Sequence, residues 1–541
     1  YLEMHRGAQT TKGDLKQRNR RAESALRAAE IVSSVVEILG RGKAPNSRLE
    51  QAWKTLLECH FHDAVTGTHC AEAGKDVASW YDGVIAGATH VLDKSRRALA
   101  PGRARGSKTL FNWTGAATAG HVFWGQPPRP QKGKLPAPRR DDMTLSADGR
   151  TFETQRLADG RLATYGDGIP SLGHKACTVV RGKPAARSRF ELTGRGVRSR
   201  HYALRFGKNG LIESLFDRDA GREVFAAPAN EFRLFEDKPG RFEAWEISKD
   251  YELRRIDAVR FLGAEDGECG ALLAGKVLRW MVGNSEIRQE VILYEHSRRI
   301  DFRTEVDWRE ERKLLRVYFP LAVLARQATY EIAYGTIDRP TKTTNSFDKA
   351  KFEVPFHRWF DVSEHGYGVS VLNDCKYGGA VRDSTASLSL LKSPRFPDPT
   401  SDVGKHVFTY CLLPHQGDWR TAGTFEEAFL LNTPFELASG ATDVPELAYV
   451  RISRPGISVE AWKKAEDGRG WILRLVDYFG QSGQVDVTLP VKLEDMQSCT
   501  IIEEPSAEKV RRRDSGFSYQ CRPFGIRSFR LTVSKNRLPL S

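Results

Sequence analysis

The hydrophobic pattern of this chain changes its period once, near Ser107, and this change divides the molecule into two kinds of structure. Before that point, apolar residues recur at the spacing of amphipathic helices. After it, apolar and polar residues alternate in short runs that are cut by Gly, Pro and Asp, as in half-buried strands. We therefore expect a multidomain α+β chain, in which a three-helix bundle precedes β-sandwich domains.

Three apolar stripes predict the three helices of the bundle. The stripes consist of Ala22, Leu26, Ala29, Val32, Val36 and Leu39, then Leu49, Trp53, Leu56, Leu57 and His60, then Val77, Trp80, Tyr81, Val84, Ala88, Val91 and Leu92. Ser47 and Glu50 form a Ser-x-x-Glu pattern that predicts a capping box at the start of the second helix. The best example of strand alternation is Ile300, Phe302, Thr304, Val306 and Trp308.

A His-Asp pair follows the second stripe, where the helix gives way to a Thr-Gly-Thr turn. At about 100° per residue, His60 falls on the apolar face with Trp53, whereas His62 points to the opposite side. Imidazole beside carboxylate is ligand chemistry for zinc and for sugar hydroxyls. His62 and Asp63 are therefore the first candidate site residues. The alternative is that His62 is a solvated surface histidine.

The run Cys59-His60-Phe61-His62-Asp63-Ala64-Val65-Thr66-Gly67-Thr68 resembles the His-Asp-(Ala/Ile)-x-x-Gly-(Thr/Ser) signature of glycoside hydrolase family 38, the zinc-dependent α-mannosidases. Other stretches resemble the same family in the same order: Tyr1 to Gly7, Asn230 to Pro239 with Ala244-Trp245, His357 to Trp359 with Asp361, Leu372 to Gly378, Lys463 to Asp467, and Ile526 to Leu531. One difference is that Cys59-His60 stands where the cytosolic and bacterial branch usually has Asn-Gln. The surroundings of the proposed metal ligand therefore stay open.

The resemblance implies an order of domains. Residues 1–10 would be the end of an N-terminal catalytic (β/α) domain, 11–106 the three-helix bundle, 107–432 a large mutarotase-like β-sandwich and 433–541 a small C-terminal β-sandwich. The last boundary is placed at Asn432-Thr433-Pro434. The Pro- and Arg-rich stretch from Pro127 to Arg140 is predicted to be a mobile loop or linker. In the family the His-Asp motif follows a whole catalytic domain, so we expect that domain to be missing from this chain.

The resemblance also implies a retaining mechanism, in which one carboxylate attacks the anomeric carbon and a second carboxyl group acts as acid and then as base. The family's zinc ion is held by two Asp and two His, and it binds adjacent mannose hydroxyls. His62 matches one of these ligands, and Asp63 matches a residue that binds substrate hydroxyls. The other ligands, the nucleophile and the general acid would lie in the catalytic domain. We therefore expect no catalytic residue in this chain, which alone should bind zinc weakly or not at all and should not hydrolyse an aryl α-mannoside.

Five further residues are candidates for contacts with the substrate. His5 lies in a segment that resembles the family's pocket wall, or it is a hydrogen-bonded turn residue. Asp374, Lys376 and Tyr377 gather at a predicted strand end, either in a sugar-facing loop or in a tight turn without a ligand. Arg358, with the tryptophan that follows it, would stack on and bond to a sugar, or would pack at a domain interface.

Charge and composition exclude several other classes of protein. The net charge is +14, but arginines alternate with acids along the chain, and the run Lys509 to Arg513 is expected to be a solvated strand edge. Zinc-finger, RNP-like, helix-turn-helix, Gly-x-Gly-x-x-Gly and Walker patterns are absent, so we expect no nucleic acid and no nucleotide cofactor. There is no run of about eighteen apolar residues, so we expect no membrane span.

The eight cysteines are scattered without a Cys-x-x-Cys pair and are expected to be free thiols in a reducing, cytoplasmic compartment. The expected partner is an α-mannoside or oligosaccharide, and a homo-oligomer stays open. Two alternatives for function also stay open. A non-catalytic carbohydrate-binding or assembly module is favoured if Tyr1 is the natural start, and an upstream Asp-rich (β/α) domain would exclude it. A mannosylglycerate hydrolase would differ in subsite residues of the catalytic domain.

Overall fold

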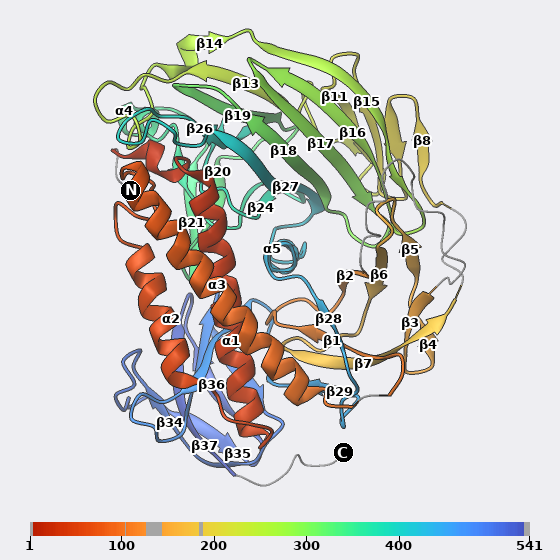
Figure 1. The fold of residues 1–541 in the computed structure, drawn as a ribbon, viewed down its shortest axis with the longest axis vertical. Coiled ribbons are helices and arrows are strands. Elements are labelled where there is room, and N and C mark those ends of the chain that lie inside the picture. Colours follow the sequence, from red (N-terminus) through yellow and green to blue (C-terminus); the bar gives the residue numbers. More distant parts are fainter. Residues whose placement is uncertain (1–3, 103, 126–142, 183–187, 535–541) are drawn as a thin grey trace.

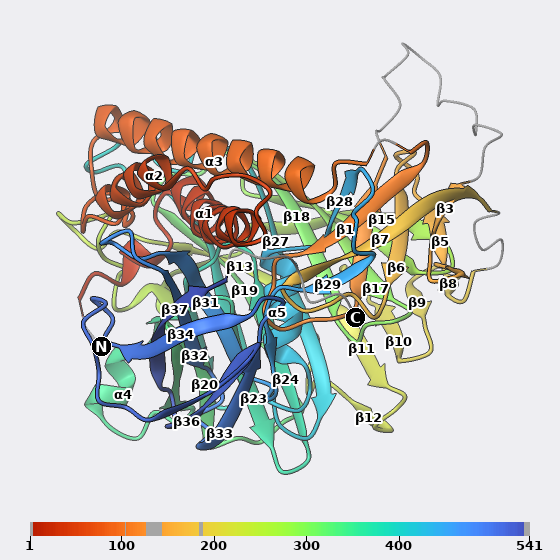
Figure 2. The same cartoon turned by 90° about the horizontal axis from the view of Figure 1, so that it is seen from below.

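The computed structural model describes residues 4–102, 104–125, 143–182 and 188–534. The predicted loop from Pro127 to Arg140 lies outside the described residues. A helical bundle runs along one side of the molecule, a large β-sandwich lies above it, and two smaller β regions lie below (Figure 1). In the view from below, the three helices lie together on one face and the sheets lie beneath them (Figure 2). The predicted α+β architecture is confirmed.

The bundle consists of α1 (Gly13–Ile38), α2 (Asn46–Cys59) and α3 (Ala71–Leu99), preceded by a short 3-10 helix, η1 (Arg6–Gln9). The three predicted helices are confirmed, but two details are wrong. Helix α2 begins at Asn46, so Ser47 already lies inside the first turn and caps nothing; Pro45 is the N-cap residue. Leu57 and Trp80 are exposed, because only a narrow stripe of α2 and of α3 is covered by the neighbouring helices.

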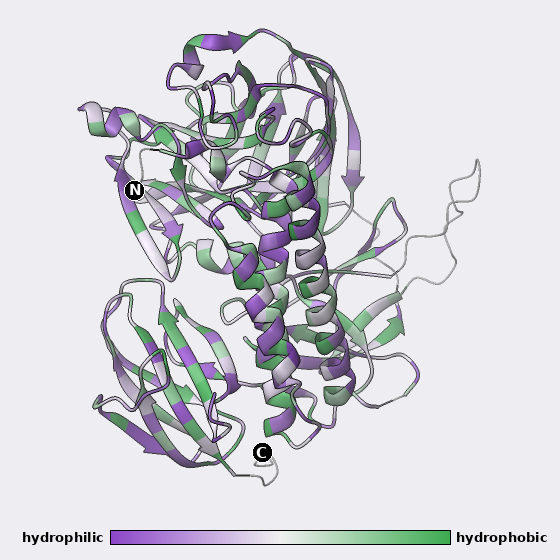
Figure 3. Cartoon of the chain, turned by 60° about the vertical axis from the view of Figure 1, so that its left-hand side comes forward, coloured by the Kyte–Doolittle hydropathy of each residue, from purple (hydrophilic) through white to green (hydrophobic). Residues whose placement is uncertain are grey.

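The bundle and the C-terminal sandwich share one hydrophobic cluster. It includes Leu26 and Ala29 of α1 together with Trp462 and Leu473 of the sandwich. The helices lie beside the C-terminal sandwich, and hydrophobic and hydrophilic residues alternate along each helix (Figure 3). Shared burial of apolar area ties the two domains together, because the apolar surface of each is removed from water by the other.

Three antiparallel sheets form the large β-sandwich. The nine-stranded sheet runs in the order β15 (Val259–Cys269), β16 (Leu273–Val282), β17 (Ser285–Tyr294), β18 (Ile300–Trp308), β27 (Gly404–Gln416), β24 (Tyr367–Asn373), β23 (Trp359–Glu364), β20 (Gln327–Ile332), β21 (Gly335–Pro340). The six-stranded sheet runs β14 (Arg255–Ile256), β13 (Glu231–Glu236), β19 (Lys313–Pro320), β26 (Thr385–Lys392), β25 (Gly378–Arg382), β22 (Val354–Pro355). The five-stranded sheet runs β12 (Arg222–Glu223), β11 (Ile212–Asp217), β10 (Tyr202–Phe206), β9 (Gly196–Arg198), β8 (Glu191–Thr193).

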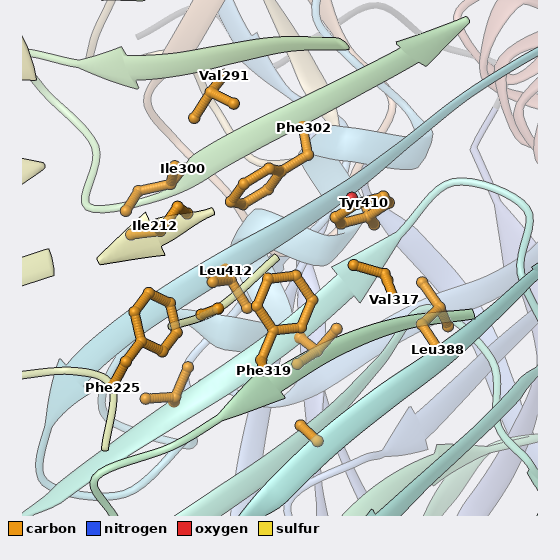
Figure 4. Packing of buried hydrophobic residues seen from close by; sticks show 14 of the residues in the cluster. Ile212, Phe225, Val291, Ile300, Phe302, Val317, Phe319, Leu388, Tyr410 and Leu412 are labelled. Atoms are coloured by element: carbon orange, nitrogen blue, oxygen red, sulfur yellow. The ribbon is translucent and has the colours of Figure 1, made fainter. Parts of the chain in front are cut away.

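Strand β18 has the predicted alternation, and all five of its inward residues are buried. Phe302 of this strand stacks on Tyr410, with ring centroids 5.1 Å apart. Phe319 of the six-stranded sheet packs against both rings, with centroids 5.8 and 6.0 Å away, and Leu388 of the same sheet belongs to the same cluster, so the core lies between two sheets (Figure 4). This packing fixes the sandwich that carries the loops described below.

A further sheet joins parts of the chain that are far apart in sequence. It contains β28 (Glu436–Ser439), β1 (Ser107–Asn112), β7 (Gly173–Arg181), β3 (Met143–Ala147) and β4 (Arg150–Thr151), and β29 (Glu446–Ala448) pairs with β7. A three-stranded sheet of β2 (Gly120–Trp124), β6 (Leu162–Gly166) and β5 (Thr154–Arg156) lies beside it. Because β28 and β29 return to β1 and β7, the C-terminal sandwich begins at β30, later in the chain than the predicted boundary at 433.

Two four-stranded sheets form the C-terminal sandwich. Their orders are β30 (Arg451–Ile452), β33 (Gly483–Thr488), β36 (Gly516–Cys521), β35 (Val510–Arg513), and β31 (Ile457–Lys464), β32 (Trp471–Asp477), β37 (Ile526–Val533), β34 (Leu493–Cys499). The basic run of the sequence forms the edge strand β35, as predicted.

Beyond Ser107 the described residues contain only short helices, namely η2 (Tyr251–Arg254), α4 (Ser346–Ala350) and α5 (Thr424–Asn432). All eight cysteines are free thiols. Among the described residues, no helix is both long and apolar enough to cross a membrane.

Candidate functional site

The His62–Asp63 pair lies in the turn that follows α2, at one end of the bundle. The side chain of His62 is 77% exposed, and its Nε2 lies 3.3 Å from Oδ2 of Asp63. The ring of Phe61 packs beside the imidazole, with centroids 4.2 Å apart. The hydroxyl of Thr66 donates to the carbonyl of His62 at 2.5 Å. The imidazole is thus presented to solvent on a backbone that the turn itself holds.

Asp63 is oriented by the same turn. Its Oδ1 accepts a hydrogen bond of 2.8 Å from the hydroxyl of Thr68, and its carbonyl accepts one of 3.2 Å from the amide of Thr68. Thr68 is buried, whereas the Asp63 side chain is 41% exposed. One carboxylate oxygen is therefore committed to the protein, and the other faces His62 and solvent.

His60 and His62 have different surroundings, as predicted, although both lie after α2, which ends at Cys59. Nε2 of His60 lies 2.8 Å from Oδ1 of Asn19 and 3.4 Å from Oε1 of Glu23, both on α1. Its side chain is 33% exposed. His60 therefore belongs to the contact between α1 and α2, and His62 does not.

A buried lysine supports this turn and was missed by the sequence analysis. Nζ of Lys16 donates to the carbonyls of Thr11 at 2.5 Å, Val65 at 2.9 Å and Thr66 at 2.9 Å. Burial lowers the pKa of Lys16 to about 7, although the carboxylate of Asp402 opposes that shift. No local pattern marks this residue, because two of its three partners lie about fifty positions along the chain.

His5 is exposed and lies directly before η1. Its amide donates to Oε1 of Glu246 at 2.7 Å, and its Nδ1 lies 3.7 Å from the same oxygen. Two residues later, the amide of Gly7 donates to the carbonyl of Trp245 at 2.8 Å. This segment therefore packs on the large sandwich, with the His5 ring at the surface. These contacts favour the interpretation that His5 is a hydrogen-bonded turn residue.

Asp374 and Lys376 are engaged inside the protein. Oδ2 of Asp374 accepts from the amide of Thr409 at 2.9 Å. Lys376 is 4% exposed, its Nζ donates to the carbonyl of Leu390 at 2.7 Å, and the same nitrogen lies 3.8 Å from the ring centre of Phe408. These contacts favour the interpretation of a tight turn without a ligand.

Tyr377 is also engaged, at the contact between the large sandwich and the bundle. Its hydroxyl oxygen accepts hydrogen bonds of 3.2 Å from Nδ2 of Asn19 and from Nε of Arg20. The guanidinium of Arg20 lies over the Tyr377 ring, 4.7 Å from its centre. Tyr377 therefore connects two domains, in a network that reaches His60 through Asn19.

Arg358 forms a buried ion pair rather than an open binding group. Its Nε donates to Oε1 of Glu331 at 3.0 Å, and its amide donates to Oε2 of the same carboxylate at 2.8 Å. Its guanidinium lies 3.8 Å from the ring centre of Phe429 on α5. Glu331 and Phe429 therefore engage the guanidinium of Arg358, and these contacts favour the interpretation that Arg358 packs at a domain interface.

Three domain families match the chain, and all belong to one larger family. They are the alpha mannosidase middle domain over residues 3–99, the glycosyl hydrolases family 38 C-terminal domain over 197–400, and the glycosyl hydrolases family 38 C-terminal beta sandwich domain over 456–529. The chain belongs to glycosyl hydrolase family 38. The match to the middle domain ends at Leu99, the last residue of α3, and the beta sandwich match runs from the residue before β31 into β37.

Similar proteins agree with this assignment to family 38. The chain is 31% identical to human alpha-mannosidase 2C1 over 560 residues and 30% identical to alpha-mannosidase G of Dictyostelium discoideum over 590 residues. These matches cover 98% of this chain but 50% and 52% of the relatives, so the chain spans about half the length of the curated relatives it matches. A crystal structure of an alpha-mannosidase from Enterococcus faecalis superimposes with a TM-score of 0.79 at 16% identity, over 97% of this chain and 68% of that one.

Proposed function

We propose that this chain is the middle and C-terminal part of a zinc-dependent, retaining α-mannosidase, and that the His62–Asp63 turn is its contribution to the active site. The single observation that carries the proposal is this exposed pair in a chain of family 38, on a turn whose backbone is held by buried hydrogen bonds. The family relatives bear the name alpha-mannosidase, and we extend that activity to the complete protein. The substrate is an α-mannoside or a mannose-containing oligosaccharide.

His62 has the properties of one metal ligand. Its imidazole is exposed and has no partner in the core, unlike that of His60. A closed zinc site needs about four ligands. Among the residues that the structure describes, no group of three His, Cys, Asp or Glu side chains is arranged to hold a metal. We therefore propose that His62 is shared with ligands from the rest of the protein, and that the bound zinc supplies coordination of adjacent sugar hydroxyls.

Asp63 is proposed to bind a sugar hydroxyl. Its Oδ1 is fixed by Thr68, so its Oδ2 is a pre-oriented acceptor beside His62. A hydrogen bond to a charged acceptor contributes about 1.5–3 kcal/mol, which is more than a neutral one. A retaining enzyme would use two carboxyl groups about 5–5.5 Å apart as nucleophile and general acid. We assign neither role to Asp63 and place both in the part of the protein outside this chain.

The test is an assay of the protein produced from its complete reading frame. We expect hydrolysis of an aryl α-mannoside, loss of activity with a chelator, and recovery on adding zinc. Nuclear magnetic resonance of the first-formed sugar should show the α anomer. The 541-residue chain alone should be inactive. A complete protein that binds mannosides without cleaving them would support a carbohydrate-binding module instead, and cleavage of mannosylglycerate in preference to oligosaccharides would reassign the substrate.

A further inference from the structure

The turn that carries His62 and Asp63 follows α2 but is also held from another helix. Its main anchor is the first turn of α1, more than forty residues earlier in the chain. Lys16 donates to the carbonyls of Val65 and Thr66 from a site that is 3% exposed. Since a buried ammonium needs partners for all of its N–H groups, these carbonyls and that of Thr11 hold the lysine, and the lysine holds the turn.

Close packing adds a second, independent constraint on the same turn. Gly67 has φ of +78°, and a Cβ atom built there would lie 2.8 Å from Cβ of Lys12 and 2.9 Å from the carbonyl oxygen of Thr11. Only glycine fits both the left-handed backbone and the lack of space. The turn therefore lies directly on the residues that begin α1.

The start of α1 is in turn fixed by the large sandwich. The amides of Lys12 and Gly13 donate to the two carboxylate oxygens of Asp402 at 2.6 and 2.7 Å. Nζ of Lys12 donates to Oδ2 of Asp398 at 2.7 Å, and both side chains of this pair are buried. Both aspartates lie in the loop between β26 and β27. Asp402 thus occupies the place of an N-terminal cap for α1, although it comes from another domain.

We propose that Lys16 is a positioning residue for the His62–Asp63 turn. We also propose that Asp398 and Asp402 of the large sandwich set the position of this turn through the first turn of α1. The β-sandwich thereby orders an active-site element through the first turn of α1. This inference rests on the proposed function for its kinetic consequence. Its structural consequence, the order of residues 61–69, does not depend on any activity.

The test uses the complete enzyme with Lys16→Met, which keeps the length of the side chain but removes its donors. We expect kcat/KM to fall about ten- to hundred-fold, mostly through kcat, with weaker retention of zinc, as for other groups that orient a metal ligand. Hydrogen exchange should become faster in residues 61–69 and stay unchanged in residues 77–92 of α3. Arg18→Met is the matched control, because Arg18 lies on the same helix in partly exposed pairs with Asp14 and Asp82.

If Lys16→Met matches Arg18→Met in hydrogen exchange, zinc content and turnover, the inference is wrong. It is also wrong if hydrogen exchange in Lys16→Met becomes equally faster throughout the bundle, because that result indicates a merely structural role. If Lys16→Met does not fold, Gly67→Ala decides. It should lower kcat/KM with α3 still protected, and unchanged activity would overturn the proposal. If the wild-type enzyme cleaves no mannoside, the proposed function fails, and exchange in residues 61–69 alone decides whether Lys16 positions the turn.

Discussion

The His62–Asp63 turn and the segment around Arg358, Asp374 and Tyr377 contain the same kinds of polar side chain but use them in opposite ways. In the turn, buried groups hold the backbone, and the imidazole and one carboxylate oxygen face solvent. In the other segment, the side chains themselves are engaged by a backbone amide, a carboxylate, neighbouring polar side chains and an aromatic ring. A polar residue at a strand end is therefore no sign of a binding site until its partners are known, because a buried polar group must be satisfied internally.

The comparison predicts that Arg358 acts on stability and not on catalysis. Arg358→Ala leaves the carboxylate of Glu331, which is 1% exposed, without its charged partner and with only the amide of residue 358 as a donor from this position, so the free energy of unfolding should fall by about 3–5 kcal/mol. Denaturant unfolding measures this loss, and Arg18→Ala, in a partly exposed pair, should lose less than about 1 kcal/mol. If Arg358→Ala keeps its stability but loses turnover, the segment belongs to the active site after all.

Glu30, a buried carboxyl group on α1, should make the free energy of unfolding depend on pH. Burial raises the pKa of Glu30 from 4.5 to about 7, and Nε1 of Trp53 donates to its Oε1 at 2.9 Å. Because the folded state binds the Glu30 proton more tightly than the unfolded state does, the bound proton stabilises the fold. This contribution of about 3 kcal/mol is complete below pH 4.5 and is lost as the pH rises to about 7. Glu30→Gln should remove this slope, whereas Glu50→Gln, an exposed control on α2, should keep it. Equal slopes in wild type and Glu30→Gln would exclude Glu30 as the source.

For the turn, the expected effect is on rate. Asp63→Asn in the complete enzyme should keep zinc but lower kcat/KM by tens- to hundred-fold, since a charged acceptor becomes a neutral one, at a cost of roughly 1.5–3 kcal/mol. Steady-state kinetics and metal analysis of the same sample check this. Loss of zinc together with rate would show that Asp63 holds the metal site and not only the sugar.

The smallest expected effect is at Tyr377. Tyr377→Phe removes the acceptor of two hydrogen bonds from Asn19 and Arg20 but keeps the ring under the guanidinium, so stability should fall by about 1 kcal/mol. Thermal unfolding and KM are the measurements. A raised KM with unchanged stability would place Tyr377 at a sugar and weaken the contrast between the two regions.

Local periodicity predicted what is set by local geometry. It predicted three helices and strand β18, because side-chain direction follows from the repeat of each element. The different surroundings of His60 and His62 agree with the helical wheel, but both residues lie after α2, which ends at Cys59, so the turn and not the helix sets their directions. The capping box failed because α2 starts one residue before Ser47. Lys16 and Asp402 could not be predicted, because their partners lie in other elements, and only the packing of α1 on the turn and on the large sandwich brings them together.

The central claim is that His62, and not its neighbour His60, belongs to the active site. The most direct test measures zinc per mole of protein together with turnover for His62→Ala and His60→Gln in the complete enzyme. We predict that His62→Ala loses both zinc and turnover while staying folded. His60→Gln should keep both and lose only stability, since its Nε2 contacts Asn19. Full zinc and rate in His62→Ala, with loss of both in His60→Gln, would contradict the account.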